Sequence, residues 1–158
     1  MRPIKAVALD LDGVLTDGTF LWGPNGEESK RFSFRDVMGI SLARKMGITF
    51  ALISGEASPL VDQFAEKLGI TAIHKGCKDK GAALQEFACT HGLALEDICF
   101  VGDDVNDLSA FALAGWAATP ADAHPKAKAA ADYVAQARGG QGAVREILDH
   151  LMESRVHL

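Results

Sequence analysis

The chain contains little cysteine, little proline and no long hydrophobic run. Its three cysteines, Cys77, Cys89 and Cys99, are odd in number and form no closely spaced pair, so the sequence predicts free thiols in a reducing compartment and a cytoplasmic location. The longest apolar runs, such as residues 48–53, are too short to cross a bilayer. An export segment is not expected either, because the apolar residues 6–9 lead directly into Asp10.

Positive charge is also scarce. The chain has 16 basic and 21 acidic residues, a formal net charge of -5. A protein that binds duplex DNA or RNA needs a basic face to neutralise phosphates, so this balance argues against a nucleic-acid partner. One local pocket can still bind a small anion. A hydrophobic fraction of 48% and only five prolines predict one compact domain over residues 1–158, without a linker.

Short apolar runs, unbroken by polar residues, recur along the chain. Strands of this kind are typical of a parallel sheet that is covered on both faces. The predicted strands are residues 4–10, 49–53, 71–74, 98–101, 116–118 and 132–135.

Helical segments alternate with these strands. Ser58 followed by proline predicts the start of one helix, and Gly69 predicts its end. Further helices are predicted over residues 79–91, 105–113 and 143–152. This alternation predicts a doubly wound α/β fold, in which ligands bind beyond the carboxyl ends of the strands.

One segment interrupts the alternation. Residues 19–22 and 30–34 flank the turn-rich sequence Gly-Pro-Asn-Gly, which predicts a β-hairpin after the first strand. Each arm carries two aromatic residues spaced two apart, and therefore turned to one side. These residues are Phe20, Trp22, Phe32 and Phe34. A lone hairpin cannot bury that much apolar surface, so it either packs against another subunit or folds back on its own sheet.

The strongest chemical signal is the pair Asp10 and Asp12, at the end of the first predicted strand. A second acidic cluster, Asp103, Asp104 and Asp107, follows the fourth. If these strands are neighbours, the acids converge on one pocket and their repulsion calls for a cation. Oxygen ligands without histidine or cysteine favour Mg²⁺ over zinc. A calcium-binding loop is excluded, because hydrophobic residues occupy the positions where it requires glycine and glutamate.

Groups suited to phosphate follow two other strands. Ser54 and Gly55 offer a hydroxyl and backbone N–H groups after the second strand. Lys80 begins the helix after the third strand, where a fixed ammonium can neutralise a phosphate oxygen. A carboxylate nucleophile, a hydroxyl, a lysine and magnesium-binding acids are the groups that phosphoryl transfer needs.

These residues stand in four motifs, at residues 10–18, at residues 53–55, at Lys80 and at residues 102–107. Together the motifs resemble those of the haloacid dehalogenase superfamily. Further segments at residues 30–32, 36, 120–125 and 139–146 narrow the resemblance to the 3-deoxy-D-manno-octulosonate 8-phosphate phosphatase family. The resemblance covers nearly the whole chain.

This resemblance implies hydrolysis of a phosphate monoester of a 2-keto-3-deoxy sugar acid. Asp10 is then the nucleophile that becomes an aspartyl phosphate. Asp12 protonates the leaving sugar oxygen and afterwards activates the water that hydrolyses the intermediate. The carboxylates of Asp10 and Asp103, with the backbone carbonyl of Asp12, are the implied ligands of Mg²⁺.

The resemblance also implies how the phosphoryl group is held. Ser54, with Gly55 beside it, and Lys80 grip the transferring group. Of the two remaining acids, Asp104 and Asp107, one orients a metal-bound water or Lys80, and the other caps the next helix.

Larger members of the superfamily insert a cap domain, but here a hairpin and one helix use the interval before the second motif. The resemblance to capless members implies a homotetramer, in which a neighbour's hairpin and C-terminal tail border the pocket. Residues 139–142 are accordingly expected to form a mobile tail. The candidate substrate-binding residues are Ser33, Arg35, Asp36, Glu56, Lys67 and Arg145. The alternative for Ser33, Arg35 and Asp36 is that they are ordinary hairpin residues.

Two positions depart from the octulosonate phosphatase pattern, since Glu56 and Phe64 stand where the family usually has arginines. Fewer cations weaken recognition of an anionic sugar acid unless Lys67 or a neighbour's Arg35 compensates. Glu56 resembles the branch that acts on nine-carbon acids such as 2-keto-3-deoxynononic acid 9-phosphate, although it can also simply cap the helix after Ser58. The eight-carbon substrate is the prediction and the nine-carbon one the alternative.

Two other functional classes fit some of these residues. Signalling receiver domains also combine acids, a hydroxyl and a lysine, but they place the phosphoacceptor aspartate on a middle strand, where this chain has Ser54. A catalytically silent phosphatase-like module, such as the tails fused to sugar-activating synthetases, normally lacks a motif residue. All four motifs are intact here, which favours an active phosphatase.

Overall fold

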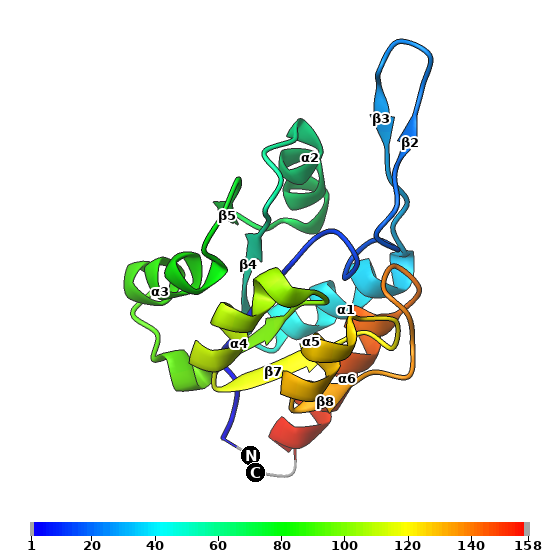
Figure 1. The fold of residues 1–158 in the computed structure, drawn as a ribbon. Coiled ribbons are helices and arrows are strands. Elements are labelled where there is room, and N and C mark those ends of the chain that lie inside the picture. The colour runs from blue at the N-terminus through cyan, green and yellow to red at the C-terminus, as the bar shows by residue number, and fades with distance from the viewer. Residues whose placement is uncertain (1, 157–158) are drawn as a thin grey trace.

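The computed structural model describes residues 2–156 and contains a parallel sheet of six strands in the order β5–β4–β1–β6–β7–β8 (Figure 1). The strands are β1 (Ala6–Leu9), β4 (Thr49–Ile53), β5 (Ala72–His74), β6 (Ile98–Val101), β7 (Trp116–Thr119) and β8 (Tyr133–Val134). All six predicted strands are therefore confirmed, with small differences at their ends.

The central strand β1 lies between β4 and β6. Ala8 pairs with Ala51 on one side and with Phe100 on the other. All four residues of β1 are buried, which explains why this strand reads as an unbroken apolar run. From β1 the chain continues outward to β4 on one side, and from β6 it continues outward to β7 on the other, so the strand order reverses between β1 and β6. Open α/β sheets bind ligands at such a switch point.

Helices cover both faces of the sheet (Figure 1). One face is covered by α1 (Phe34–Lys45), α2 (Pro59–Leu68) and α6 (Ala143–Val156), and the other by α3 (Lys80–Thr90), α4 (Leu108–Leu113) and α5 (Pro125–Ala130). Val7 and Leu9 of β1 pack into the first layer, whereas Ala6 and Ala8 pack into the second. The doubly wound α/β fold is thus confirmed.

The predicted helix caps are also present. Ser58 Oγ accepts a hydrogen bond from Leu60 N–H, and Gly69 ends α2 with a φ of 68°. Asp79 caps α3 by accepting from Ala82 N–H at 3.1 Å. The helix expected over residues 105–113 begins as a 3₁₀ turn, Val105–Asp107, and continues as α4. α6 runs to Val156, four residues beyond its predicted end.

The hairpin forms a separate antiparallel pair, β2 (Leu21–Trp22) with β3 (Glu28–Ser29), and projects away from the sheet (Figure 1). The prediction of its second arm at residues 30–34 was wrong, because the strand lies at Glu28–Ser29 and Phe34 is the first residue of α1. The Ser33 hydroxyl accepts from Arg35 N–H at 3.2 Å, and this N-cap outweighs the aromatic alternation. Phe32 turns inward against Phe64, with ring centroids 4.6 Å apart.

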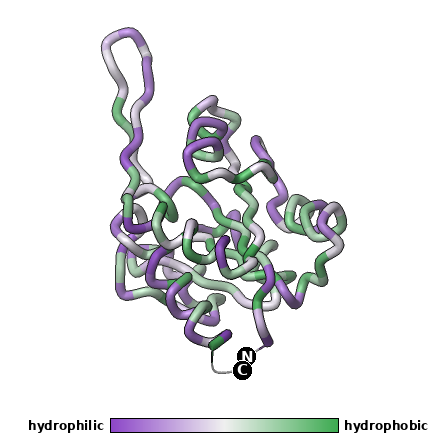
Figure 2. The backbone as a smooth tube through the Cα atoms, turned by 180° about the vertical axis from the view of Figure 1, so that it is seen from behind, coloured by the Kyte–Doolittle hydropathy of each residue, from purple (hydrophilic) through white to green (hydrophobic). Residues whose placement is uncertain are grey.

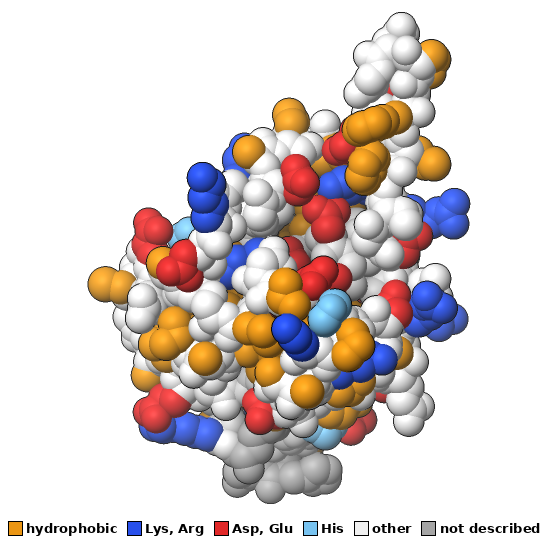
Figure 3. Space-filling view, in the orientation of Figure 1, with side chains coloured by type: hydrophobic (Ala, Val, Ile, Leu, Met, Phe, Trp, Pro, Cys, Tyr) orange, Lys and Arg blue, Asp and Glu red, His pale blue; other side chains and the backbone are white. Residues whose placement is uncertain are grey.

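The first arm of the hairpin keeps its aromatic side chains in solvent. Phe20 is 48% exposed and Trp22 is 71% exposed, and their ring centroids lie 5.2 Å apart. A hydrophobic stretch on the hairpin lies away from the rest of the chain (Figure 2), and hydrophobic side chains gather on its lower part (Figure 3). The hairpin therefore does not fold back on its own sheet.

The glycine-rich segment near the carboxyl end packs against the loop that follows β1. Gly140 N–H donates to the Val14 carbonyl at 3.1 Å. A β-carbon at Gly139 would overlap the Gly13 carbonyl, so glycine permits this close approach of two backbones. The expectation of a mobile tail was wrong, since the segment supports the loop and leads directly into α6.

Within residues 2–156, no helix has the length and apolarity needed to span a membrane. The three cysteines are free thiols, as predicted.

Candidate active site

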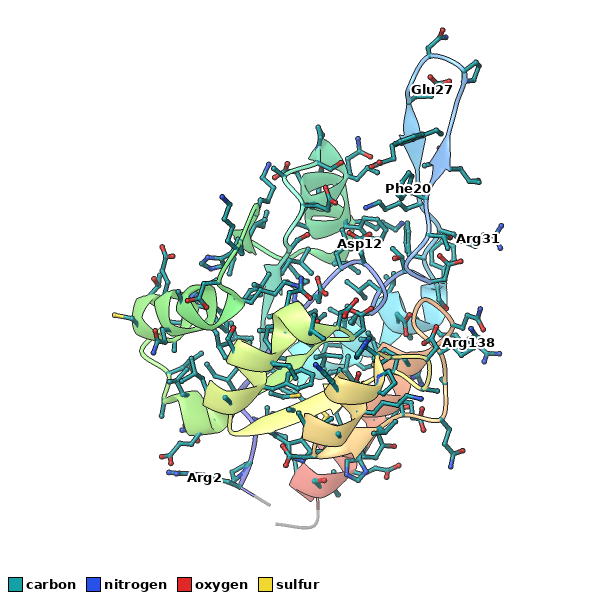
Figure 4. The ribbon with its side chains drawn as sticks, viewed as in Figure 1. Arg2, Asp12, Phe20, Glu27, Arg31 and Arg138 are labelled. Atoms are coloured by element: carbon teal, nitrogen blue, oxygen red, sulfur yellow. The ribbon has the colours of Figure 1, made fainter. Side chains whose placement is uncertain are left out.

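A pocket of about 400 Å³ opens at the carboxyl edge of the sheet, beside the β1–β6 switch point. It is lined by Asp10, Asp12, Gly18, Gly55, Glu56, Lys80, Asp103, Asp104 and Asn106. Asp12 lies below α2 and the hairpin and well away from Arg2, which is at the lower end of the molecule (Figure 4). The predicted clusters after β1 and β6 therefore converge.

Asp10 is held by both of its carboxylate oxygens. Its backbone N–H donates to the Val101 carbonyl at 2.9 Å, which continues the pairing of β1 with β6. Oδ1 accepts from Leu11 N–H at 2.7 Å, and Oδ2 lies 3.0 Å from Lys80 Nζ. The side chain is almost fully buried, so its orientation is fixed by these contacts.

Lys80 bridges Asp10 and Asp107. Its ammonium donates to Asp107 Oδ1 at 2.8 Å, and its side chain is only 1% exposed. Asp107 Oδ2 accepts from the backbone N–H groups of Asp103 and Asp104, at 2.8 and 3.1 Å. Burial alone lowers the pKa of Lys80, but Asp10 and Asp107 outweigh that effect and raise it. Lys80 is therefore a fixed cation.

These contacts separate the roles of the two remaining acids. Asp107 orients Lys80, and both of its oxygens are occupied. Asp104 Oδ1 accepts from Val105 N–H at 2.6 Å and caps the 3₁₀ turn, while its side chain borders the pocket.

The acidic groups carry more negative charge than Lys80 can balance. Carboxylate oxygens of Asp10, Asp103 and Asp107 lie within 4.8 Å of one another. Burial raises the pKa of Asp10 well above 3.8, and Asp107 and Asp103 add to this effect. Burial and Asp107 raise the pKa of Asp103 to about 7. A hard divalent cation relieves this repulsion, so the donor set fits Mg²⁺.

Gly13 provides the space for the Asp103 carboxylate. Its φ of 81° lies in the left-handed region, and a β-carbon there would overlap Asp103 Oδ2. Glycine is required at this position on both counts.

Gly55 and Glu56 line the side of the pocket that follows β4, and Ser54 lies just before them outside that lining. Ser54 is buried, and its Oγ accepts from Glu56 N–H at 3.1 Å. Glu56 lines the pocket, whereas Ser58 provides the cap of α2. The capping role considered for Glu56 is therefore wrong.

Sequence reasoning missed two residues near the chemistry. Lys30 Nζ donates to Asp12 Oδ1 at 2.7 Å, and Asn106 lines the pocket. Lys30 comes from the hairpin base, 18 residues from its partner, so no local pattern reveals the contact. Asn106 lies inside the fourth motif, and this position is the signal by which the sequence could have identified it as a site residue.

Asp36 was assigned to the substrate, and this was wrong. Its carboxylate is fully buried between α1 and α6, where Oδ1 accepts from Arg145 N–H at 3.0 Å. It caps α6, so no sugar can reach it.

Four other predicted substrate-binding residues also lie outside the lining of this pocket. The Arg145 side chain pairs with Asp149 at 2.9 Å. Lys67 Nζ lies 5.4 Å from the centroid of the Phe34 ring. Ser33 caps α1 and Arg35 is exposed. Among the predicted substrate residues, Glu56 is the one that borders the pocket.

Comparison with known proteins identifies the family of the chain. Residues 70–147 match the family of haloacid dehalogenase-like hydrolases. The 3-deoxy-D-manno-octulosonate 8-phosphate phosphatase KdsC of Escherichia coli K12 is 40% identical over 149 residues, which cover 94% of this chain and 79% of the relative.

Solved structures extend the similarity to the whole fold. The phosphatase of the same name from Moraxella catarrhalis, in complex with a magnesium ion, a phosphate ion and KDO, superimposes with a TM-score of 0.93 at 35% identity and covers 97% of this chain and 88% of its own. The cobalt-bound deoxy-D-mannose-octulosonate 8-phosphate phosphatase from Haemophilus influenzae gives 0.94 at 37% identity, with coverages of 98% and 90%. The chain belongs to the 3-deoxy-D-manno-octulosonate 8-phosphate phosphatase family of haloacid dehalogenase-like hydrolases.

Proposed function

We propose that this chain is a Mg²⁺-dependent phosphatase that acts on a phosphorylated 2-keto-3-deoxy sugar acid. The proposed substrate is 3-deoxy-D-manno-octulosonate 8-phosphate. The observation that carries the proposal is the convergence of Asp10, Asp103 and Lys80 at the switch point. The identity of 40% to a phosphatase of that name over 94% of the chain supports the choice of substrate.

Asp10 is the proposed nucleophile. One of its oxygens attacks phosphorus, and the bond from phosphorus to the sugar oxygen breaks, which gives an aspartyl phosphate. The contacts of Asp10 with Leu11 N–H and Lys80 hold the carboxylate in one orientation, so little reorganisation is needed before attack.

Asp12 is the proposed acid and base. It gives a proton to the departing sugar oxygen and then takes one from the water that attacks the aspartyl phosphate. That second step forms the bond from phosphorus to the water oxygen and releases Asp10 and inorganic phosphate. Asp12 borders the pocket, and its side chain is 32% exposed, so both substrate and water can reach it.

The carboxylates of Asp10 and Asp103 and the backbone carbonyl of Asp12 are the proposed Mg²⁺ ligands. The cation would neutralise charge on the phosphoryl oxygens. Ser54, Gly55 and Lys80 complete the phosphate site, since Ser54 retains a hydroxyl hydrogen and Lys80 is a permanent cation.

Glu56 is the proposed determinant of the sugar. Its carboxylate can accept hydrogen bonds from sugar hydroxyls, which favours the nine-carbon alternative, 2-keto-3-deoxynononate 9-phosphate. We therefore propose a comparison of eight-carbon and nine-carbon phosphorylated acids on the wild type and on Glu56→Arg. The expected result is that Glu56→Arg raises kcat/KM for the eight-carbon acid relative to the nine-carbon acid. Phosphate release from neither acid would contradict the proposed function.

Asp10→Asn provides the test against a silent module or a receiver-like domain. An amide cannot act as the nucleophile, so phosphate release should stop while the melting temperature changes little. Substantial turnover by this variant would contradict the covalent mechanism.

We also propose that the protein is a cytoplasmic homotetramer in which hairpins border neighbouring pockets. Support comes from free thiols and from large apolar side chains left in solvent near the hairpin. These side chains are Phe20, Leu21, Trp22, Phe34 and Met38. The exposed Arg35, together with Ser33, Lys67 and Arg145, is proposed to act in such an assembly. Sedimentation at micromolar concentration tests this, and a monomer would contradict the shared pocket.

A further inference from the structure

Lys30 lies outside the four motifs, yet its ammonium contacts a residue within them. Nζ donates to Asp12 Oδ1 at 2.7 Å. The Lys30 side chain is 4% exposed, although it comes from the base of a projecting hairpin. A lysine is rarely buried to this extent unless its charge is paired, and here the partner is the proposed acid and base.

The backbone of Lys30 is held on both sides. Directly before it, Ser29 of β3 pairs with Leu21 of β2. Two residues after it, Phe32 packs edge-on against Phe64 of α2. Lys30 therefore reaches Asp12 from a fixed starting point, which limits the positions that its ammonium can take.

The contact occupies one side of the Asp12 carboxylate. Within residues 2–156, the hydrogen bond to this carboxylate involves Oδ1, and Oδ2 has no protein partner. Lys30 itself is not among the residues that line the pocket. This arrangement leaves Oδ2 available to exchange a proton with the substrate and with water.

We propose that Lys30 is a positioning residue for Asp12. This inference rests on the proposed function and adds a residue to it. By fixing Oδ1, Lys30 keeps Oδ2 directed to the reacting atoms in both proton transfers. Without Lys30, the Asp12 side chain can rotate away, because none of the described contacts replaces the lost one.

The two steps of the reaction depend differently on Asp12. A sugar oxygen leaves poorly as an anion and needs the proton from Asp12. The p-nitrophenolate ion leaves readily without one. For p-nitrophenyl phosphate, the first step therefore needs little help from Asp12, whereas removal of the phosphoryl group from Asp10 by water still needs it as a base.

Lys30→Met tests the proposal, because it keeps the apolar stem and removes the charge. With the sugar phosphate and Mg²⁺, we expect kcat to fall by about 100-fold, in the range that proton transfer contributes, with little change in KM. With p-nitrophenyl phosphate, rapid-mixing measurements should show a burst of one p-nitrophenolate per active site, followed by slow turnover. Lys30→Arg should recover part of the rate.

Lys5, whose side chain is 57% exposed, provides a control for the loss of a lysine–aspartate pair away from the pocket. Its ammonium lies 2.7 Å from Asp97, the same separation as in the Lys30–Asp12 pair, but this pair lies at the amino end of β1. Lys5→Met should keep wild-type kinetics with both substrates. Melting temperatures of all variants show whether each is folded, and Lys30→Gln replaces Lys30→Met if the methionine variant is not.

Asp12→Asn separates this inference from the proposed function. If Asp12→Asn turns over normally, the assignment of Asp12 as acid and base fails. If Asp12→Asn gives a burst and then stalls while the Lys30 variants resemble the wild type, the positioning role alone is overturned. An equal loss with both substrates, without a burst and without recovery by arginine, also overturns it, because that pattern indicates a purely structural ion pair.

Discussion

The backbone of Gly13 lies directly against the carboxylate of Asp103. These residues come from the loops after β1 and β6, so their contact sets how closely the two acidic clusters approach. The close approach tolerates no side chain at position 13.

We predict that Gly13→Ala lowers kcat/KM by about 100-fold, since displacement of a charged group by about an ångström costs that much in an organised site. Gly47→Ala is the control, because Gly47 has a φ of 84° but nothing within 4 Å of an added β-carbon. It carries the same backbone strain without the overlap. Steady-state kinetics should show near-normal activity for Gly47→Ala, and similar losses in both variants would contradict the prediction.

We predict that Asp107→Asn lowers kcat/KM by about 100- to 1000-fold, because Lys80 loses the charge that orients it. Inorganic phosphate should also inhibit this variant more weakly. Asp62→Asn removes an exposed ion pair to Lys75 at 2.6 Å and should have little effect. An unchanged inhibition constant for phosphate in Asp107→Asn would argue against the role of Lys80 in binding.

Mg²⁺ should raise the melting temperature of the wild type, since a cation that binds the folded state relieves the repulsion among its carboxylates. We predict a much smaller rise for Asp103→Asn, measured by calorimetry over a series of Mg²⁺ concentrations. Chelation should stop phosphate release without unfolding the protein. An equal rise in both proteins would place the cation elsewhere.

Asp36 should affect stability rather than catalysis. Asp36→Ala removes the cap of α6, with an expected cost of about 1 kcal/mol in the free energy of unfolding and no change in KM. Chemical denaturation and kinetics on the same sample measure the two effects. A raised KM with unchanged stability would restore the substrate-binding assignment.

The pH dependence of stability gives a second test of Asp36. Burial raises its pKa above the ordinary value of 3.8, so the folded state binds this proton more tightly than the unfolded state. The extra stability that this proton gives to the folded state is fully present when the pH is below the ordinary pKa of 3.8, and it is lost as the pH rises through the folded pKa. The free energy of unfolding of the wild type relative to Asp36→Asn should therefore fall as pH rises through this window. A rise would contradict the sign of the shift.

The sheet was predictable from sequence because its strands are buried on both faces and read as apolar runs. α2 was predictable for a local reason, since Ser58 and Gly69 mark its ends within the sequence itself. The start of α1 was not, because aromatic residues spaced two apart before Arg35 imitate a strand. Phe34 lies in solvent on the finished helix, so its hydrophobicity carried no information about the core.

The candidate site was predictable where it follows strand ends. Asp10 and Asp103 could be brought together by the rule that parallel strands end at one edge. Asp36 and Lys30 could not be placed, because their partners belong to α6 and to the loop after β1. Such contacts depend on how whole elements pack, which no local spacing specifies.

In the proposed mechanism, most of the hydrolytic residues and the proposed determinant of the sugar come from different loops. Asp10, Asp12 and Asp103 follow β1 and β6 and Lys80 begins α3, whereas Glu56 follows β4, next to the proposed phosphate-site residues Ser54 and Gly55. If Glu56 selects the sugar as proposed, related genes can diverge in the metabolite they accept through this one position while the groups that break the phosphate ester are retained.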